Sequence, residues 1–180
     1  METNFFPQDR LFHVSDDPAI PIFKPRPSPS AFETIKGDVV FAITQRLLHN
    51  YLLPRDCPRV SFYAGPATIQ KDVDHFFGAA TAPYVLAIEK AWLPGIMEAT
   101  IYLYELPPDA FELLDVCAGY YIAYEAVKPI AVRTIPNILD ELLTRDIELR
   151  LVPSLWPLAD AVTASSLNYS CIRMRNAAPR

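Results

Sequence analysis

Proline punctuates this chain more strongly than any other residue type, and it limits the folds that the chain can adopt. Eighteen prolines are spread over 180 residues, against only five glycines. Because proline lacks a backbone N–H and fixes φ, it is disfavoured inside helices and at the centre of a sheet. The composition therefore favours short strands and stiff loops over a bundle of long helices.

Short segments rich in β-branched and aromatic residues predict β-strands. Two of them, Val39–Ile43 and Tyr84–Glu89, are uninterrupted apolar runs, as expected of strands buried on both faces. Pro129 places a further strand near a sheet edge. The remaining predicted strands are Leu11–Ser15, Arg59–Ala64, Ala99–Pro107, Gly119–Tyr124 and Ile147–Val152.

Helical spacing of apolar residues predicts helices over 44–54, 68–78 and 137–145, and a weaker one over 155–167. Thr44, Thr68 and Asn137 are the expected N-caps. Because helices are few and inserted early and late among the strands, we expect an α+β fold with a mixed or mostly antiparallel sheet. The length, without repeats or linkers, predicts one globular domain over 1–180.

Composition excludes several classes of protein. The chain is 51% apolar with a net charge of −5, which favours a buried core and argues against broad nucleic-acid binding. No stretch approaches the roughly 20 apolar residues that span a bilayer, and the N-terminal METNFFPQDR lacks the pattern of a secretory signal. Three separated cysteines and three histidines predict neither a metal site nor a disulfide framework. We therefore expect a cytoplasmic protein with reduced thiols.

The first predicted strand carries two polar residues on one face. Alternation places Leu11, His13 and Ser15 on one side and Phe12 and Val14 on the other. If Phe12 and Val14 face the core, His13 and Ser15 can reach one ligand. The alternative is that His13 is a hydrogen-bonded core residue.

Arginines supply candidate anion ligands at three places. Arg26 lies in a proline-clamped extended segment. Arg55 lies in the proline-bracketed loop after the first predicted helix, and Arg59 opens the next predicted strand. Arg173 and Arg175 alternate with apolar residues, as a final edge strand would. Guanidinium groups bind phosphate or carboxylate bidentately. The alternatives are solvated surface charges, or a loop braced by pairing between Asp56 and an arginine.

Four further residues have two interpretations each. Tyr120 and Tyr121 point to opposite sheet faces, so one can pack in the core while the other offers a ring and hydroxyl to a cleft. Glu105 ends an apolar strand, where it is either catalytic or neutralises an arginine. Cys57 would be a nucleophile if its neighbouring arginines lowered the thiol pKa, but passive burial is the favoured interpretation.

The motifs LFHVSDDPAI, NYLLPRDCPRV, DVCAGYY, LWPL and IRMRN resemble, over nearly the whole chain, a bacterial family of uncharacterised proteins. More loosely, their order resembles the ADP-ribosyltransferase-like fold. Members of that fold carry a histidine followed two residues later by Ser or Thr, here His13 and Ser15, and a small hydroxyl residue ending the second strand, here Thr44. The resemblance implies that these residues hold the ribose and nicotinamide of NAD. Where such enzymes carry a catalytic glutamate, this chain has Gly119-Tyr120-Tyr121.

The leading hypothesis is a cleft for NAD or a related nucleotide, with His13, Tyr120 and Glu105 as catalytic candidates. The ligand-binding candidates are Ser15, Arg26, Thr44, Arg55, Arg59, Tyr121, Arg173 and Arg175. The second hypothesis is a non-enzymatic module that binds an anionic metabolite or nucleotide through the arginines. A hydrolase or transferase using Cys57 is the third. Whether the chain is an enzyme, its ligand and its oligomeric state are not predicted.

Overall fold

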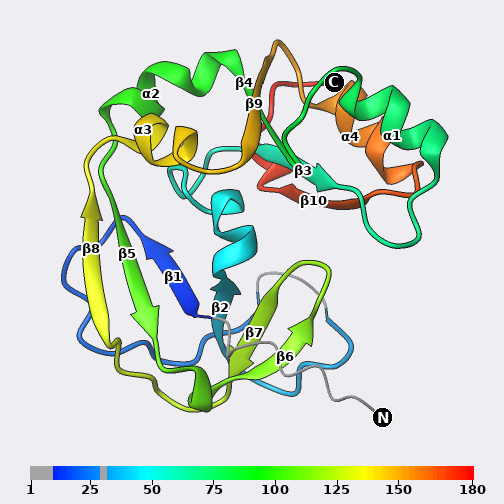
Figure 1. Ribbon diagram of the computed structural model, residues 1–180. Coiled ribbons are helices and arrows are strands. Elements are labelled where there is room, and N and C mark those ends of the chain that lie inside the picture. The colour runs from blue at the N-terminus through cyan, green and yellow to red at the C-terminus, as the bar shows by residue number, and fades with distance from the viewer. Residues whose placement is uncertain (1–9, 29–31) are drawn as a thin grey trace. The chain divides into compact units, whose positions relative to one another are not determined.

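The computed structural model describes residues 10–28 and 32–180 (Figure 1). The N-terminal stretch, in which the sequence predicts no secretory signal, and residues 29–31 lie outside the described residues. Contacts divide the chain into two compact units: the described residues of 1–48 and 101–135 form unit 1, and 49–100 and 136–180 form unit 2. The single domain expected over 1–180 stays a prediction.

Unit 1 is built on a six-stranded sheet in which every neighbouring pair is antiparallel. The strand order is β6-β7-β2-β1-β5-β8 (Figure 1). These strands are β1 (Leu11–Ser15), β2 (Val40–Thr44), β5 (Ile101–Leu106), β6 (Glu112–Asp115), β7 (Tyr120–Ala123) and β8 (Ala131–Ile135). The short 3-10 helix η3 (Pro108–Ala110) follows β5.

The core of unit 1 joins the sheet to the long β1–β2 connection. Leu11, Val40 and Tyr104 pack with Phe23 of that connection. Phe23 also exchanges two backbone hydrogen bonds of 2.8 Å with Val127. Burial of these apolar groups fixes the connection against one face of the sheet.

Unit 2 is built on a four-stranded mixed sheet in the order β10-β3-β4-β9. Only β4 and β9 run parallel among these pairs. The strands are β3 (Arg59–Tyr63), β4 (Tyr84–Glu89), β9 (Ile147–Val152) and β10 (Asn168–Ile172). Its helices are α1 (Gln70–Phe77), η2 (Lys90–Trp92), α2 (Leu93–Glu98), α3 (Ile138–Leu143), α4 (Trp156–Thr163) and η4 (Met174–Asn176).

Helices α1 and α4 cover one face of this sheet. Phe76 of α1 and Val162 of α4 pack on Val60 and Phe62 of β3 and on Val85 of β4. These side chains are buried because alternate residues of β3 and β4 point to the same side. The result is a second hydrophobic core within unit 2.

The α+β prediction and the mostly antiparallel sheet are confirmed. The seven strands predicted with explicit bounds are all present, with ends shifted by two residues at most. The predicted helix over 44–54 is instead the 3-10 helix η1 (Gln45–Asn50), a form that occurs in short pieces. The final strand predicted over Arg173 and Arg175 is wrong: β10 ends at Ile172, because Arg173 adopts a left-handed backbone with φ 57°.

Candidate functional site

Register separates the predicted site residues of unit 1 between two faces of the sheet. Leu11 pairs with Thr44, His13 with Tyr104, and Ala42 with Tyr121. Directly opposed residues of antiparallel strands point to the same side, and neighbours along a strand to opposite sides. We call the two sides face A, which holds His13, Ser15, Thr44 and Tyr121, and face B, which holds Phe12, Phe41, Glu105 and Tyr120.

The three catalytic candidates are therefore not on one face. Glu105 pairs with Phe12, and Tyr120 pairs with Ile43, so both lie on face B while His13 lies on face A. The opposite orientation of Tyr120 and Tyr121 agrees with the sequence-based expectation. The structure brings His13, Ser15, Thr44 and Tyr121 to the same side of three adjacent strands.

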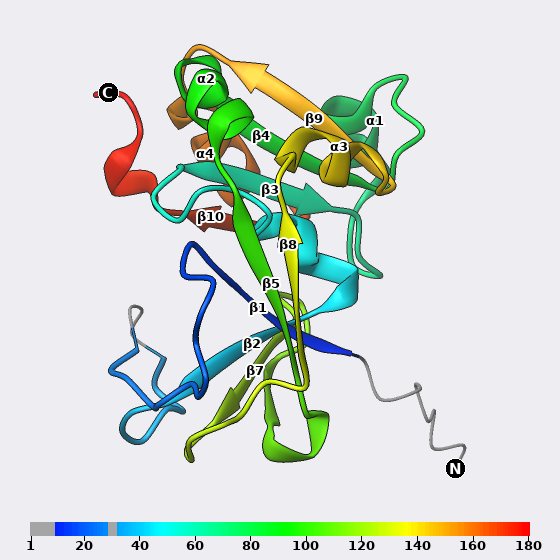
Figure 2. The same cartoon turned by 90° about the vertical axis from the view of Figure 1, so that its left-hand side faces the viewer.

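Strands β1 and β2 separate beside His13. They pair only at Leu11–Thr44 and Phe12–Ile43, whereas β1 pairs with β5 along its whole length, and the two strands diverge in Figures 1 and 2. The Nδ1 atom of His13 lies 2.9 Å from the carbonyl oxygen of Phe41. A carbonyl only accepts, so Nδ1 donates, and the neutral ring has its unprotonated nitrogen at Nε2. The imidazole thus spans the point where the strands part.

His13 and Ser15 also make contacts that support a structural role. The His13 ring is half-buried, with its centroid 4.7 Å from that of Phe23. The Ser15 hydroxyl accepts a hydrogen bond of 3.1 Å from the Asp17 amide, as a turn residue does. These contacts orient both side chains.

Thr44 is buried where β2 meets the turn before β7. Thr44 is 4% exposed, and its Oγ1 atom has no hydrogen-bond partner among the described residues. The Thr44 amide donates to the Gly119 carbonyl at 3.1 Å. A Cβ at position 119 would lie 2.7 Å from Thr44 Oγ1, and Gly119 has φ +68°. Glycine is therefore required here for both conformation and space.

The two tyrosines have different neighbours. Tyr121 packs against the core of unit 1 on face A. Tyr120 lies in a cluster with Phe32 and Phe41, whose ring centroids are 6.2–6.3 Å from one another. All three of these rings are half-buried. The cluster explains the position of Tyr120 by aromatic packing.

Glu105 is engaged by an arginine that the sequence analysis did not single out. Arg10 donates from Nε at 2.8 Å and from Nη2 at 2.6 Å to the two carboxylate oxygens. The hydrogen bond and the positive charge of Arg10 lower the pKa of Glu105. Glu105 is thus an anion on face B that pairs with Arg10. This matches the interpretation in which Glu105 neutralises an arginine. Only the strand-end positions of the two residues could have indicated the pair.

The remaining arginines differ in accessibility. Arg26 is exposed, and its backbone exchanges hydrogen bonds of 3.0 and 2.9 Å with Val39. Arg59 is only 2% exposed. Its guanidinium donates to the carbonyls of Asn50 at 2.9 Å and Cys57 at 2.6 Å, so it braces the loop. In unit 2, Arg55 and Arg175 are exposed and Arg173 is partly so.

Cys57 is buried, and its environment opposes the nucleophile hypothesis. Burial, only partly offset by the charge of Arg59, raises the pKa of the thiol to about 11. The thiol is therefore neutral near pH 7 and unreactive. In residues 10–28 and 32–180, no group of three or more potential ligands could hold a metal ion.

Residues 12–177 match a family described only as a family of unknown function, DUF6886. The chain belongs to this family. The match spans every candidate residue from His13 to Arg175, and it confirms the resemblance to an uncharacterised family. No curated protein and no solved structure matches the DUF6886 chain. Neither comparison supports the ADP-ribosyltransferase-like fold.

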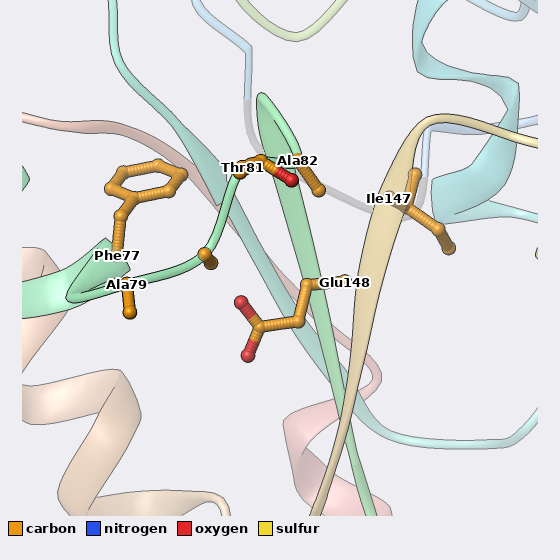
Figure 3. Close-up of a pocket in the computed structure, with 7 residues that line it drawn as sticks. Phe77, Ala79, Thr81, Ala82, Ile147 and Glu148 are labelled. Carbon is orange, nitrogen blue, oxygen red and sulfur yellow. The ribbon is translucent and has the colours of Figure 1, made fainter.

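Two open depressions lie in unit 2 of this DUF6886 protein, away from the predicted residues. One, of about 560 Å³, is lined by Phe77, the segment 79–82, Ile147 and Glu148 (Figure 3). Glu148 is held there by Arg150 at 2.6 Å. The other, of about 620 Å³, is lined mainly by α1 and α4. Small residues dominate the first lining, so no sequence signal indicated it.

Helices in the described part of the DUF6886 chain are short. None of them has the length and apolar character that crossing a membrane requires.

Proposed function

We propose that this protein binds a nucleotide-like ligand, with NAD as the specific candidate, on face A of unit 1 where β1 and β2 separate. The observation that carries the proposal is the His13 imidazole, which the Phe41 carbonyl orients at the end of the two-residue β1–β2 ladder. Its fixed tautomer makes Nε2 a hydrogen-bond acceptor suited to a sugar hydroxyl.

Neighbouring groups suit the same class of ligand. Thr44 offers a buried hydroxyl two residues along β2 from Ala42, the residue that pairs with Tyr121. A buried hydroxyl without a partner among the described residues is costly unless something else satisfies it. Tyr121, which is half-buried and packs against the core of unit 1, adds an aromatic ring on the same face. Hydroxyl groups and a flat ring together match a nucleoside.

The ADP-ribosyltransferase-like part of the proposal comes from the sequence motifs. His13, Ser15 and Thr44 occupy strand positions that resemble the NAD-holding residues of that fold. Their common orientation on face A is what such a site would need. Arg26, exposed before β2, is the candidate for a ligand phosphate in this unit.

The arrangement favours binding over ADP-ribosyl transfer. A catalytic carboxylate stabilises the cationic transition state, and a neutral tyrosine does not. The segment Gly119-Tyr120-Tyr121 has no acid, and Glu105 is paired with Arg10 on face B. We therefore expect the protein to bind NAD without consuming it rapidly. An activity assay should then show little turnover, as the hypothesis of a non-enzymatic binding module predicts.

Calorimetric titration with NAD, ADP-ribose and nicotinamide tests the proposal. His13→Asn keeps a donor for the Phe41 carbonyl but lacks the Nε2 acceptor, so it should fold normally and weaken binding at least about tenfold. His13→Gln, which places an amide near the Nε2 position, should retain more affinity. Absence of saturable binding of all three ligands at millimolar concentration, or equal affinities of His13→Asn and the wild type, would overturn it.

A further inference from the structure

We infer that unit 2 carries a separate anion-binding site for a phosphate monoester or pyrophosphate group, formed by the guanidiniums of the exposed Arg55 and Arg175 and the partly exposed Arg173. We call these three residues the arginine patch. This inference goes beyond the proposed ligand site of unit 1 and involves none of its residues.

A side-chain hydrogen bond holds the two segments of the arginine patch together. The Asn176 amide donates to the Asp56 carbonyl at 2.7 Å, across 120 residues of sequence. Ile172 also pairs with Arg59 in the β10–β3 ladder. The segment after β10 therefore lies beside the loop before β3 (Figure 2). Arg55 and Arg175 each adjoin a residue of this hydrogen bond.

The loop that carries Arg55 is rigid. The Cys57 amide donates to the Pro54 carbonyl at 3.0 Å, which closes a turn between two prolines. The buried Arg59 guanidinium donates hydrogen bonds to the Cys57 carbonyl at 2.6 Å and to the Pro54 carbonyl at 3.5 Å. A cation displayed on such a loop loses little backbone freedom when it binds an anion.

Arg173 has an unusual backbone. Among residues 10–28 and 32–180, it is the one non-glycine residue with positive φ. A left-handed conformation is unfavourable for a non-glycine residue, so glycine or asparagine would be the expected choice. The backbone N–H of Asn176 donates to the Arg173 carbonyl at 2.9 Å and closes the turn that contains Arg175. The proposed site gives the arginine at this strained position a role.

Positive charge is in excess at the arginine patch. Residues 54–59 and 172–177 hold the three patch guanidiniums and the buried guanidinium of Arg59. They hold a single carboxylate, that of Asp56. Nearby, Glu89 accepts from the Leu155 and Ala178 amides, and Arg180 pairs with Asp160. Among the described residues, the patch arginines form no ion pair.

This excess occurs in a chain whose net charge is −5. Guanidinium groups match the oxygens of phosphate in a bidentate fashion, and several of them favour a dianion over a monocarboxylate. The arginine patch thus fits a phosphate monoester or a pyrophosphate group.

Titration with inorganic phosphate, pyrophosphate and acetate, followed by calorimetry and by amide chemical shifts, tests the inference. We expect saturable pyrophosphate binding that weakens with rising salt, since Arg55 and Arg175 are exposed and Arg173 is partly exposed. Arg173→Gly suits the left-handed backbone and removes only the side chain, and Arg55→Ala and Arg175→Ala remove the other guanidiniums. Each should weaken binding at least about tenfold. Lys71→Ala, which removes an exposed cation of α1, is the matched control and should have no effect.

The outcomes of these titrations either support the arginine patch or overturn it. Shifts that cluster at residues 54–58 and 172–177 support the site. Absence of saturation at millimolar pyrophosphate, equal binding of acetate, or an equal loss in Lys71→Ala would overturn it. Because the probes lack a nucleoside, failure here leaves the unit 1 proposal standing, and failure of NAD binding leaves this site standing.

Discussion

Thr44 and Gly119 approach each other so closely that only glycine fits at the second position. The Thr44 amide donates to the Gly119 carbonyl at 3.1 Å, and the Thr44 hydroxyl lies 2.7 Å from where a Cβ at position 119 would be. This contact buries a threonine hydroxyl beside a turn with positive φ. It is also part of the face on which we propose the ligand site.

Substitution Gly119→Ala should destabilise the protein by about 2–4 kcal/mol. The added methyl would contact Thr44 Oγ1 and lie 3.1 Å from the Leu47 side chain, in a backbone conformation unfavourable to alanine. Urea denaturation measures the loss. In a Thr44→Ala background the same substitution should cost less, and equal costs in the two backgrounds would contradict the packing account.

Alkylation should distinguish Cys57 from the exposed Cys117. Burial raises the pKa of Cys57 to about 11, so its neutral thiol should resist iodoacetamide near pH 8 in the native protein. The raised pKa also adds stability below the unfolded value of about 8.5, and this is lost as pH rises through 11. Peptide mapping after native and denaturing labelling measures both sites. Labelling of native Cys57 as fast as Cys117 would contradict the burial account.

Most of the strands could be predicted, because local pattern determines them. The β4 run Tyr84–Glu89 and the β1 run Leu11–Ser15 match their predicted ends, since apolar runs and alternation are readable within one segment. Helix α2 was missed because Pro94 and Gly95 resemble a loop, although proline is tolerated in the first helical turn.

The arrangement of the site could not be predicted to the same extent. Whether Glu105 shares a face with His13 depends on its pairing with Phe12, a relationship between strands about 90 residues apart that neither strand specifies alone. The burial of Arg59 could not be predicted, because arginines are mostly exposed. Its burial depends on carbonyls of Asn50 and Cys57 that only the folded loop brings together.

Truncation of the Glu89 side chain should destabilise unit 2. Glu89 is 2% exposed and accepts from the Leu155 amide at 3.1 Å and the Ala178 amide at 3.0 Å. Glu89→Ala leaves these amides without an acceptor and should cost about 2–4 kcal/mol, and Glu89→Gln should cost less. Glu98→Ala, at an exposed position of α2, is the control. Chemical denaturation that gives equal stabilities for Glu89→Ala and Glu98→Ala would be inconsistent with this role.

The Arg10–Glu105 pair should make stability depend on acid pH. Its hydrogen bonds and charge lower the pKa of Glu105 in the folded state, so the contribution is present above the unfolded value of about 4.3 and is lost as pH falls through the lowered pKa. The Arg10 side chain is 57% exposed, so the effect should be small and should weaken with salt. Melting temperatures of wild type and Glu105→Gln should converge in acid. A constant difference across pH would show that the pair contributes through packing alone.

The most direct test of the ligand site combines melting temperature and NAD affinity in Thr44→Val. Valine keeps the shape of threonine and removes a buried hydroxyl that has no partner among the described residues, so the free protein should gain about 1 kcal/mol, or roughly 2–4 °C. NAD binding should weaken about tenfold, because the ligand would lose a hydrogen-bond partner. Thr134→Val, on the exposed strand β8, should change neither quantity. A lower melting temperature together with unchanged NAD affinity would contradict the account.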